Sequence, residues 1–258
     1  MDSKFVPSLI ELAEKYAAAS QLSVQLEDGA VTLECDKGKF RFFYDFNRQL
    51  PQDTFKNVPL FHWRQKRRYI ELKGLVQRDM VGKALAMRIH HIVPPDAFTK
   101  SLRDVLLYEC DLFQYICGGE IRRVFADFSG DTYTNCIMSA GGQKASMELG
   151  LSAAGSESVL LHEVVGRKGI ASDLPVDTQM QQYPIYLIKG NGTQTFNEID
   201  FELYGMDNTQ ADMIRFILWA LSDAERIDSL CRDYSRLDKI WQAAVKSSAN
   251  LTYTFVEE

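Results

Sequence analysis

The sequence lacks several features that would place it in a specialised class of protein. It has no apolar run of the roughly 18 residues that a membrane-spanning helix needs. It shows no charged-then-apolar leader, and its five cysteines form no CxxC pair. Together these absences predict a reduced, cytoplasmic chain. The formal net charge of −6 argues against a general nucleic-acid-binding protein, because such proteins usually carry a basic surface.

Catalytic and metal-binding motifs are also scarce. The sequence has no GxSxG, no HExxH and no P-loop pattern. His90 and His91 are adjacent in a predicted strand, residues 83–93, so their side chains point to opposite faces of it. We therefore interpret both as structural residues and predict no metal site. The segment 190–192 reads Gly-Asn-Gly, and we interpret it as a hairpin turn and not as a phosphate-binding turn.

The sequence does contain enough apolar residues for a large core, since 46% of its 258 residues are hydrophobic. Residues 7–20 carry apolar side chains at helical spacing, and three short alternating runs separated by turn residues follow them. The runs predict a small meander, at residues 22–26, 30–35 and 39–46. A proline-containing loop comes next. We predict an N-terminal lobe of residues 1–58 and a larger domain of residues 59–258.

One amphipathic helix organises the larger domain. Its apolar side chains recur at helical spacing between Leu102 and Ile116, and two glycines at 118 and 119 predict its end. Tyr108, Asp111 and Tyr115 are three and four residues apart and share one face of this helix. A carboxylate between two phenols can form a binding or catalytic site. The alternative is a solvated helix edge with an aromatic rim.

Two further patterns complete the outline. Arg64, Lys66, Arg67 and Arg68 lie among aromatic residues, which favours either an anion site or the solvated face of a helix. After residue 120 the chain is rich in strands, with two amphipathic helices near its end. The predicted strands are residues 121–128, 132–139, 143–151, 159–165, 183–189, 195–204 and 251–256, and the helices are residues 209–221 and 236–249.

Four segments, in order along the chain, resemble a known family. Residues 44–48 end in Phe-Asn-Arg, like one of its strands, and residues 70–83 are similar to its helix that ends Gly-Glu-Ile-Gly-Lys. Residues 108–120 are similar to its His-x-x-Asp-Leu-Leu-x-x-Leu-x-Gly-x-Glu helix. Residues 237–247 are similar to its terminal helix, an apolar run followed by Glu-Ala-x-x-x-Ser-Ala. Over roughly residues 40–258 the chain resembles the C-terminal domain of the glucose–fructose oxidoreductase/inositol dehydrogenase/MocA (Gfo/Idh/MocA) family.

The resemblance implies an α+β fold, with a large open, mainly antiparallel sheet, helices on one face, and a dimer formed through the other face. Full-length members of the family add a Rossmann domain, bind NAD or NADP, and move hydride to or from sugars and cyclitols. By the same resemblance, Asp111 matches the family aspartate, Tyr108 and Tyr115 replace histidines, and Asn47 and Arg48 become candidate substrate-binding residues. The chain departs from the family because it has no dinucleotide fingerprint and no Glu-Lys-Pro motif with the catalytic lysine.

Three functional hypotheses follow. The first is a non-catalytic relative that binds no NAD or NADP in this chain. Its ligand would be a polyol or sugar acid near Tyr108, Asp111 and Tyr115. The second is an NAD(P)-dependent oxidoreductase whose cofactor domain comes from a partner or an upstream segment, with Tyr115 exchanging a proton and Asp111 orienting it. The third is an anion- or nucleic-acid-binding module that uses the basic run, which the acidic total disfavours.

The strand pattern also predicts a homodimer. Residues 159–165 carry apolar side chains in both registers, with Leu161 on one face and Leu160 on the other. A strand with one face in water would alternate more cleanly with charged residues, so a second copy of the chain is the expected cover. The alternative is that the N-terminal helix and meander fold back over this face.

Overall fold

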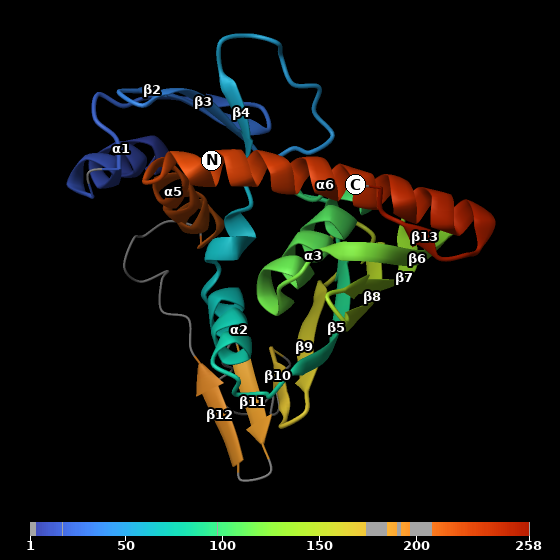
Figure 1. Cartoon of the computed structure of the whole chain (residues 1–258). Coiled ribbons are helices and arrows are strands. Elements are labelled where there is room, and N and C mark those ends of the chain that lie inside the picture. The colour runs from blue at the N-terminus through green and yellow to red at the C-terminus, as the bar shows by residue number, and fades with distance from the viewer. Residues whose placement is uncertain are drawn as a thin grey trace. The chain divides into compact units, whose positions relative to one another are not determined.

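A computed structural model describes residues 4–16, 18–96, 98–173, 185–189, 192–196 and 208–257, as Figure 1 shows. The described residues form five α-helices and two sheets whose strands are mostly antiparallel, which confirms the predicted α+β class. The chain divides into two compact units. The first unit combines residues 1–66 with 199–236, and the second combines residues 67–198 with 237–258. The predicted lobe of residues 1–58 lies within the first unit, and its boundary stays a prediction.

The first unit contains a four-stranded sheet in the order β1-β2-β3-β4. Strands β1, β2 and β3 pair antiparallel in sequence, which confirms the predicted meander, and β3 pairs parallel with β4. The bounds are Ser23–Glu27 for β1, Ala30–Cys35 for β2, Gly38–Phe43 for β3 and Lys56–Pro59 for β4. Its helices are α1 (Phe5–Lys15), the short 3₁₀ helix η1 (His62–Gln65) and α5 (Asn208–Leu221).

The second unit contains a nine-stranded sheet in the order β12-β11-β10-β9-β5-β8-β7-β6-β13. Every neighbouring pair is antiparallel except β5 and β8, so the prediction of a large, mainly antiparallel sheet is confirmed. The bounds are Ala84–Val93 (β5), Ile121–Ser129 (β6), Tyr133–Ala140 (β7), Gln143–Leu151 (β8), Val159–Gly166 (β9), Ile170–Ser172 (β10), Ile185–Lys189 (β11), Gly192–Phe196 (β12) and Thr254–Phe255 (β13). Residues 190 and 191 of the predicted hairpin turn, and most of the predicted strand 195–204, lie outside the described residues.

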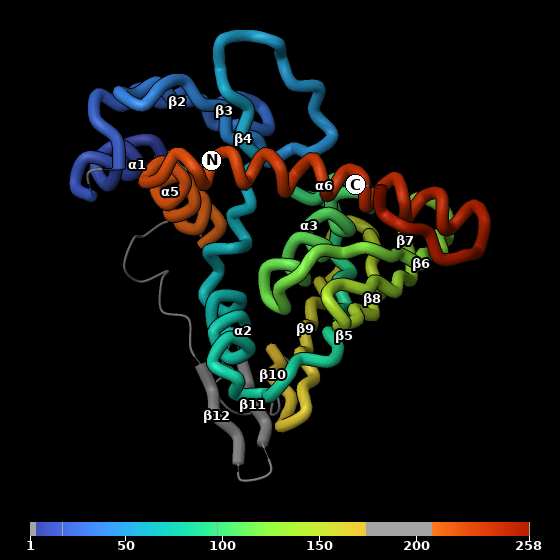
Figure 2. The backbone as a smooth tube through the Cα atoms, viewed as in Figure 1, coloured from blue at the N-terminus to red at the C-terminus, as the bar shows by residue number. Residues whose placement is uncertain are grey.

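Helix α3 (Leu102–Cys117) lies against the centre of this sheet and contacts β5, β7 and β8. It begins with a capping box, in which the Ser101 hydroxyl accepts from the Asp104 N–H and the Asp104 carboxylate accepts from the Ser101 N–H. It ends at Gly118, whose φ of 73° suits a residue without a side chain. The chain then returns as β6 (Figure 2). Helix α2 (Arg67–Gln77) packs on α3, β10 and β11.

Helix α6 (Ala224–Asn250) is longer than the predicted helix of residues 236–249, because Ile227 and Leu230 extend its apolar stripe through an otherwise polar stretch. Its far end covers part of strand β6. The Ser247 and Ser248 hydroxyls accept hydrogen bonds from the N–H groups of Ala126 and Phe128, each at 3.0 Å. These bonds satisfy donors of β6 beyond its short pairing with β13. None of the described helices combines the length and the apolar character of a membrane span.

Candidate functional site

The three residues predicted on the central helix occupy different environments. Tyr108 is 9% exposed and Asp111 is fully buried, whereas Tyr115 is half-buried. The Tyr108 hydroxyl donates to the Tyr69 hydroxyl at 3.0 Å. Burial, together with the neighbouring Tyr69 and Glu109, raises the pKa of Tyr108 well above its ordinary value. Tyr108 is therefore a neutral, hydrogen-bonded residue of the protein interior.

Tyr115 is the member of the trio that solvent reaches most. The ammonium nitrogen of Lys73, on α2, lies 3.6 Å from the centroid of its ring. That distance is typical of a cation held over an aromatic face. The pair places a phenol and a cation side by side on adjacent helices, and a partly exposed phenol can both donate and accept hydrogen bonds.

Asn47 and Arg48, the two candidate substrate-binding residues, lie in the first unit. Asn47 is exposed, and its backbone N–H donates to the Asp45 carboxylate at 3.0 Å. The Arg48 guanidinium pairs with Glu27 at 2.7 Å. The central-helix residues lie in the second unit. A substrate role for Asn47 and Arg48 therefore stays a prediction.

A buried group of ionisable side chains lies beside Tyr108, and sequence reasoning missed it. We call His91, Glu109, His162 and Asp173 the histidine–carboxylate cluster. The Asp173 Oδ2 lies 2.8 Å from Nδ1 of His162, and Nε2 of His162 lies 3.1 Å from Oε2 of Glu109. The Glu109 Oε1 lies 2.5 Å from Nδ1 of His91. The chain of contacts therefore runs from the end of β10 through β9 and α3 to β5.

Aromatic rings and one cation enclose the cluster. The Tyr69 ring meets His162 edge to face with centroids 5.0 Å apart, and Tyr108 meets His91 in the same way at 5.2 Å. These arrangements suit the charge distribution of aromatic rings. Arg68, from the basic run, has its guanidinium 3.9 Å from the Asp173 carboxylate. Apolar ring surface therefore keeps water from most of the charged atoms.

The geometry fixes the charges of the central pair. Both ring nitrogens of His162 face carboxylate oxygens, so both must donate and the ring must be protonated. Burial alone would lower the pKa of His162, but Glu109 and Asp173 outweigh it and raise that pKa to about 9. Burial also opposes the charge on Glu109, yet its contacts with His162 and His91 lower its pKa to about 2. The cluster therefore holds an ion pair inside the protein.

Two signals in the sequence point to this cluster. Glu109 occupies the apolar stripe of its helix, four residues after Val105 and three before Leu112, where a carboxylate needs a buried partner. His91 and His90 do point to opposite faces of β5, as predicted, because His91 joins the cluster while His90 pairs with Glu148 at 2.9 Å. His162 and Asp173 are distant in sequence, and only the fold brings them to Glu109.

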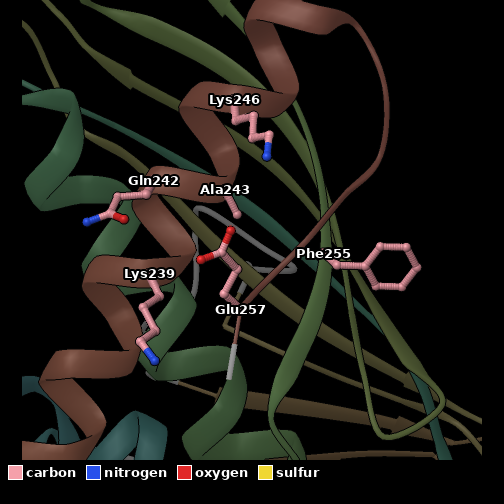
Figure 3. A pocket seen from close by; sticks show the side chains of 6 residues that line it. All are labelled: Lys239, Gln242, Ala243, Lys246, Phe255 and Glu257. Carbon is pink, nitrogen blue, oxygen red and sulfur yellow. The ribbon is translucent and has the colours of Figure 1, made fainter.

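One further hollow lies on the surface of the second unit. A pocket of about 130 Å³ is lined by Lys239, Gln242, Ala243, Lys246, Phe255 and Glu257, as Figure 3 shows. Its polar groups come mainly from one face of α6, and the carboxylate of Glu257 lies between the two lysines in that view. Across the described residues, no three His, Cys, Asp or Glu side chains are arranged to hold a metal ion.

The comparisons with known proteins give a match at the level of structure alone. No protein-family model and no curated protein matches the sequence. A probable dehydrogenase from Thermotoga maritima has a TM-score of 0.54 and 18% identity, over 78% of this chain and 66% of that chain. Levoglucosan dehydrogenase in complex with NADH and levoglucosan has a TM-score of 0.62 and 16% identity, over 77% of this chain and 65% of that chain.

An oxidoreductase domain protein from Kribbella flavida is similar as well, with a TM-score of 0.62 and 14% identity over 79% of this chain. Over 77–79% of its length the chain shares the fold of part of these proteins. The predicted resemblance is thereby confirmed as a likeness of fold. The chain spans about two thirds of the length of these proteins, 66% for the Thermotoga maritima dehydrogenase and 65% for levoglucosan dehydrogenase.

Proposed function

We propose that this chain is a ligand-binding relative of sugar dehydrogenases that does not itself transfer hydride. The observation that carries the proposal is the burial of Tyr108 and Asp111, the two residues that match the family's histidine and aspartate. A group that exchanges a proton with substrate must lie within hydrogen-bond reach of it. Tyr108 instead donates to Tyr69, and Asp111 is fully enclosed by protein.

The described part of the first unit supports the same proposal. Its sheet is a meander with one parallel pair, which differs from the strand–turn–helix unit that holds a dinucleotide pyrophosphate. Hydride transfer needs a cofactor held against the substrate, and the protein supplies that position. The proposal is therefore that this chain keeps the sheet and central helix of a dehydrogenase for binding.

The proposed ligand is a polyol or sugar acid, and its contact is the half-buried Tyr115 with the neighbouring Lys73. The phenol offers a donor and an acceptor to hydroxyl groups, and the ammonium suits a carboxylate. Calorimetry with myo-inositol and with gluconate, without added cofactor, tests this. We expect saturable binding that Tyr115→Phe weakens and that Tyr253→Phe, a tyrosine under the Arg123 cation, leaves unchanged. Binding that appears only with NAD(H) present would refute the proposal.

A second candidate is an NAD(P)-dependent oxidoreductase completed by another domain. The matched levoglucosan dehydrogenase holds NADH and levoglucosan, and this chain spans 65% of it, which favours that reading. In that case Tyr115 would exchange the proton. Mixing the chain with cell extract and NAD⁺ and following sugar-dependent absorbance of NADH would separate the two, since the first proposal expects no activity dependent on this chain.

We also propose that the chain forms a homodimer through the face of the large sheet away from α3. That face mixes apolar side chains with ion pairs. Ile137 and Val159 are each more than a third exposed, and Arg88 lies 3.4 Å from Glu163. A partner copy would bury the apolar groups and retain the charged pairs. Light scattering at tens of micromolar should give twice the chain mass of 29.4 kDa, and a value near 29.4 kDa would refute the dimer.

A further inference from the structure

The histidine–carboxylate cluster has one member that reaches solvent. The side chains of Glu109 and His162 are fully buried and that of Asp173 is 1% exposed, whereas the His91 side chain is 7% exposed. His91 therefore forms the outer end of the chain of contacts. None of the described residues is hydrogen-bonded to its Nε2. The buried side-chain nitrogens and oxygens that lack a hydrogen-bond partner do not include this Nε2, so the atom is open to solvent.

The inner contact of His91 determines which nitrogen can accept a proton. Its Nδ1 lies 2.5 Å from Oε1 of Glu109, and that carboxylate also accepts from the protonated His162. An ionised carboxylate can only accept a hydrogen bond, so Nδ1 of His91 must donate. In the neutral imidazole the lone pair then lies on Nε2, at the end of the ring away from Glu109.

The remaining members hold Glu109 in place. His162 binds both oxygens of Glu109, at 3.2 and 3.1 Å, and Asp173 binds the other ring nitrogen of His162. The Asp173 carboxylate also accepts from the backbone N–H of His162 at 2.5 Å. Each side chain is therefore fixed by the next, and the orientation of the His91 ring follows from the whole series. Catalytic and ligand-binding histidines are commonly oriented by a carboxylate in this way.

We propose that Nε2 of His91 is a hydrogen-bond-accepting site for a hydroxyl-bearing ligand, oriented by Glu109, with His162 and Asp173 as positioning residues. A ligand O–H would donate a hydrogen bond to Nε2, while the Nδ1–H of His91 continues to donate to Glu109. The site uses none of the site residues predicted from the sequence, where His91 is interpreted as a structural residue. That the ligand carries hydroxyl groups rests on the proposed function. If His91 binds no such ligand, binding at Tyr115 and Lys73 is unaffected, so a failure of the His91 proposal is distinguishable from a failure of the proposed function.

Two measurements on the folded protein test the site. Diethyl pyrocarbonate acylates an unprotonated imidazole nitrogen that solvent reaches, so it should modify His91 and spare the enclosed His162. A His90→Gln background leaves a single histidine in that peptide for mass spectrometry. Nitrogen-15 spectra of the histidine rings should show His91 with its proton on Nδ1. Acylation of His91 no faster than that of His162, or a proton on Nε2 of His91, would overturn the proposal.

Two variants test the positioning role of Glu109. Glu109→Gln keeps a side-chain oxygen that can accept from Nδ1, and Glu109→Leu has no acceptor. We expect the Nδ1–H form of His91 to persist in Glu109→Gln and to give way to a mixture of forms in Glu109→Leu. A purely structural role would alter stability and leave the tautomer unchanged. If Glu109→Leu does not fold, the spectrum of the unsubstituted protein still decides the proposal.

Discussion

The second unit keeps every charge of its ionisable cluster away from water, whereas the first unit partly exposes the carboxylates of a comparable cluster. In the second unit, His162 lies between Glu109 and Asp173 with all three side chains at most 1% exposed. In the first unit, the 4%-exposed Arg41 contacts Glu27 and Asp53, and those two carboxylates are 28% and 36% exposed. Both clusters join distant parts of the chain through hydrogen-bonded ion pairs.

The difference lies in what happens when one partner is lost. A buried charge without its partner has no water to replace it, so breaking such a pair is costly even where forming it contributes little. An exposed charge regains water when its partner is removed, and its pair contributes little at the outset. The buried cluster therefore makes the second unit sensitive to single substitutions, and the first unit should tolerate changes at the partly exposed members of its cluster, Glu27, Arg48 and Asp53.

The largest effect is expected for His162→Leu. This substitution leaves Glu109 and Asp173 buried without the imidazolium between them, and the expected loss of unfolding free energy is roughly 3–5 kcal/mol. Urea denaturation followed by circular dichroism measures it. Arg48→Leu in the first unit is the matched control, since it removes a cation from a half-exposed pair with Glu27. Equal losses in the two variants would show that burial does not distinguish the clusters.

The next largest effect is a loss of unfolding free energy at alkaline pH. The pKa of His162 is raised from 6.5 to about 9 in the folded protein, so its stabilisation is complete below pH 6.5 and is lost as the pH rises through 9. The full loss is at most roughly 3 kcal/mol. Unfolding free energies between pH 6 and 10 should show the decline in the unsubstituted chain. The same decline in His162→Leu would assign it to other groups.

A smaller effect is expected for Tyr108→Phe. The Tyr108 hydroxyl donates to Tyr69 inside the protein, and its removal leaves that buried hydroxyl without a donor. The expected loss is about 1 kcal/mol. Thermal unfolding measures it, with Tyr253→Phe as a control at a 42%-exposed tyrosine. A stabilised Tyr108→Phe variant would indicate that the hydroxyl pair is strained instead of favourable.

The smallest effect is expected for Glu27→Gln in the first unit. Glu27 pairs with both Arg41 and Arg48 and is partly exposed, so the expected loss is below about 1 kcal/mol. Because salt screens exposed charges, the difference from the unsubstituted chain should shrink further in 1 M sodium chloride, where the screening length is about 3 Å. A loss of unfolding free energy as large as that of His162→Leu would show that the partly exposed Glu27 pairs stabilise the protein as strongly as the buried cluster does.

Much of the fold follows from local pattern. The alternation in residues 30–35 and 39–46 predicts the strands β2 and β3, and the apolar spacing from Leu102 to Ile116 predicts α3. Helix α6 shows where prediction from local pattern fails. Its first half carries few apolar side chains, so periodicity alone missed the stretch from 224 to 235. Tertiary packing of Ile227 and Leu230 extends the helix there.

The candidate site was harder to predict, because its members meet only in the folded chain. Tyr108, Asp111 and Tyr115 share a helix face by spacing, yet spacing does not tell which of them faces solvent. The sequence does place Glu109, a charged residue, on an apolar helix stripe. The residues that complete its cluster, His162 and Asp173, come from other elements. The register of the sheet pairs His162 with Ile89, on the face that packs against α3, and no local sequence pattern specifies that register.

The central claim is that this chain keeps a dehydrogenase fold without the hydride chemistry. The most direct test is a titration of the purified chain with NADH, followed by the fluorescence of the nicotinamide. We expect no saturable binding below about 10 μM, which corresponds to roughly −7 kcal/mol. Saturable binding in that range, with a matching result for NAD⁺ by calorimetry, would contradict the account and favour the oxidoreductase.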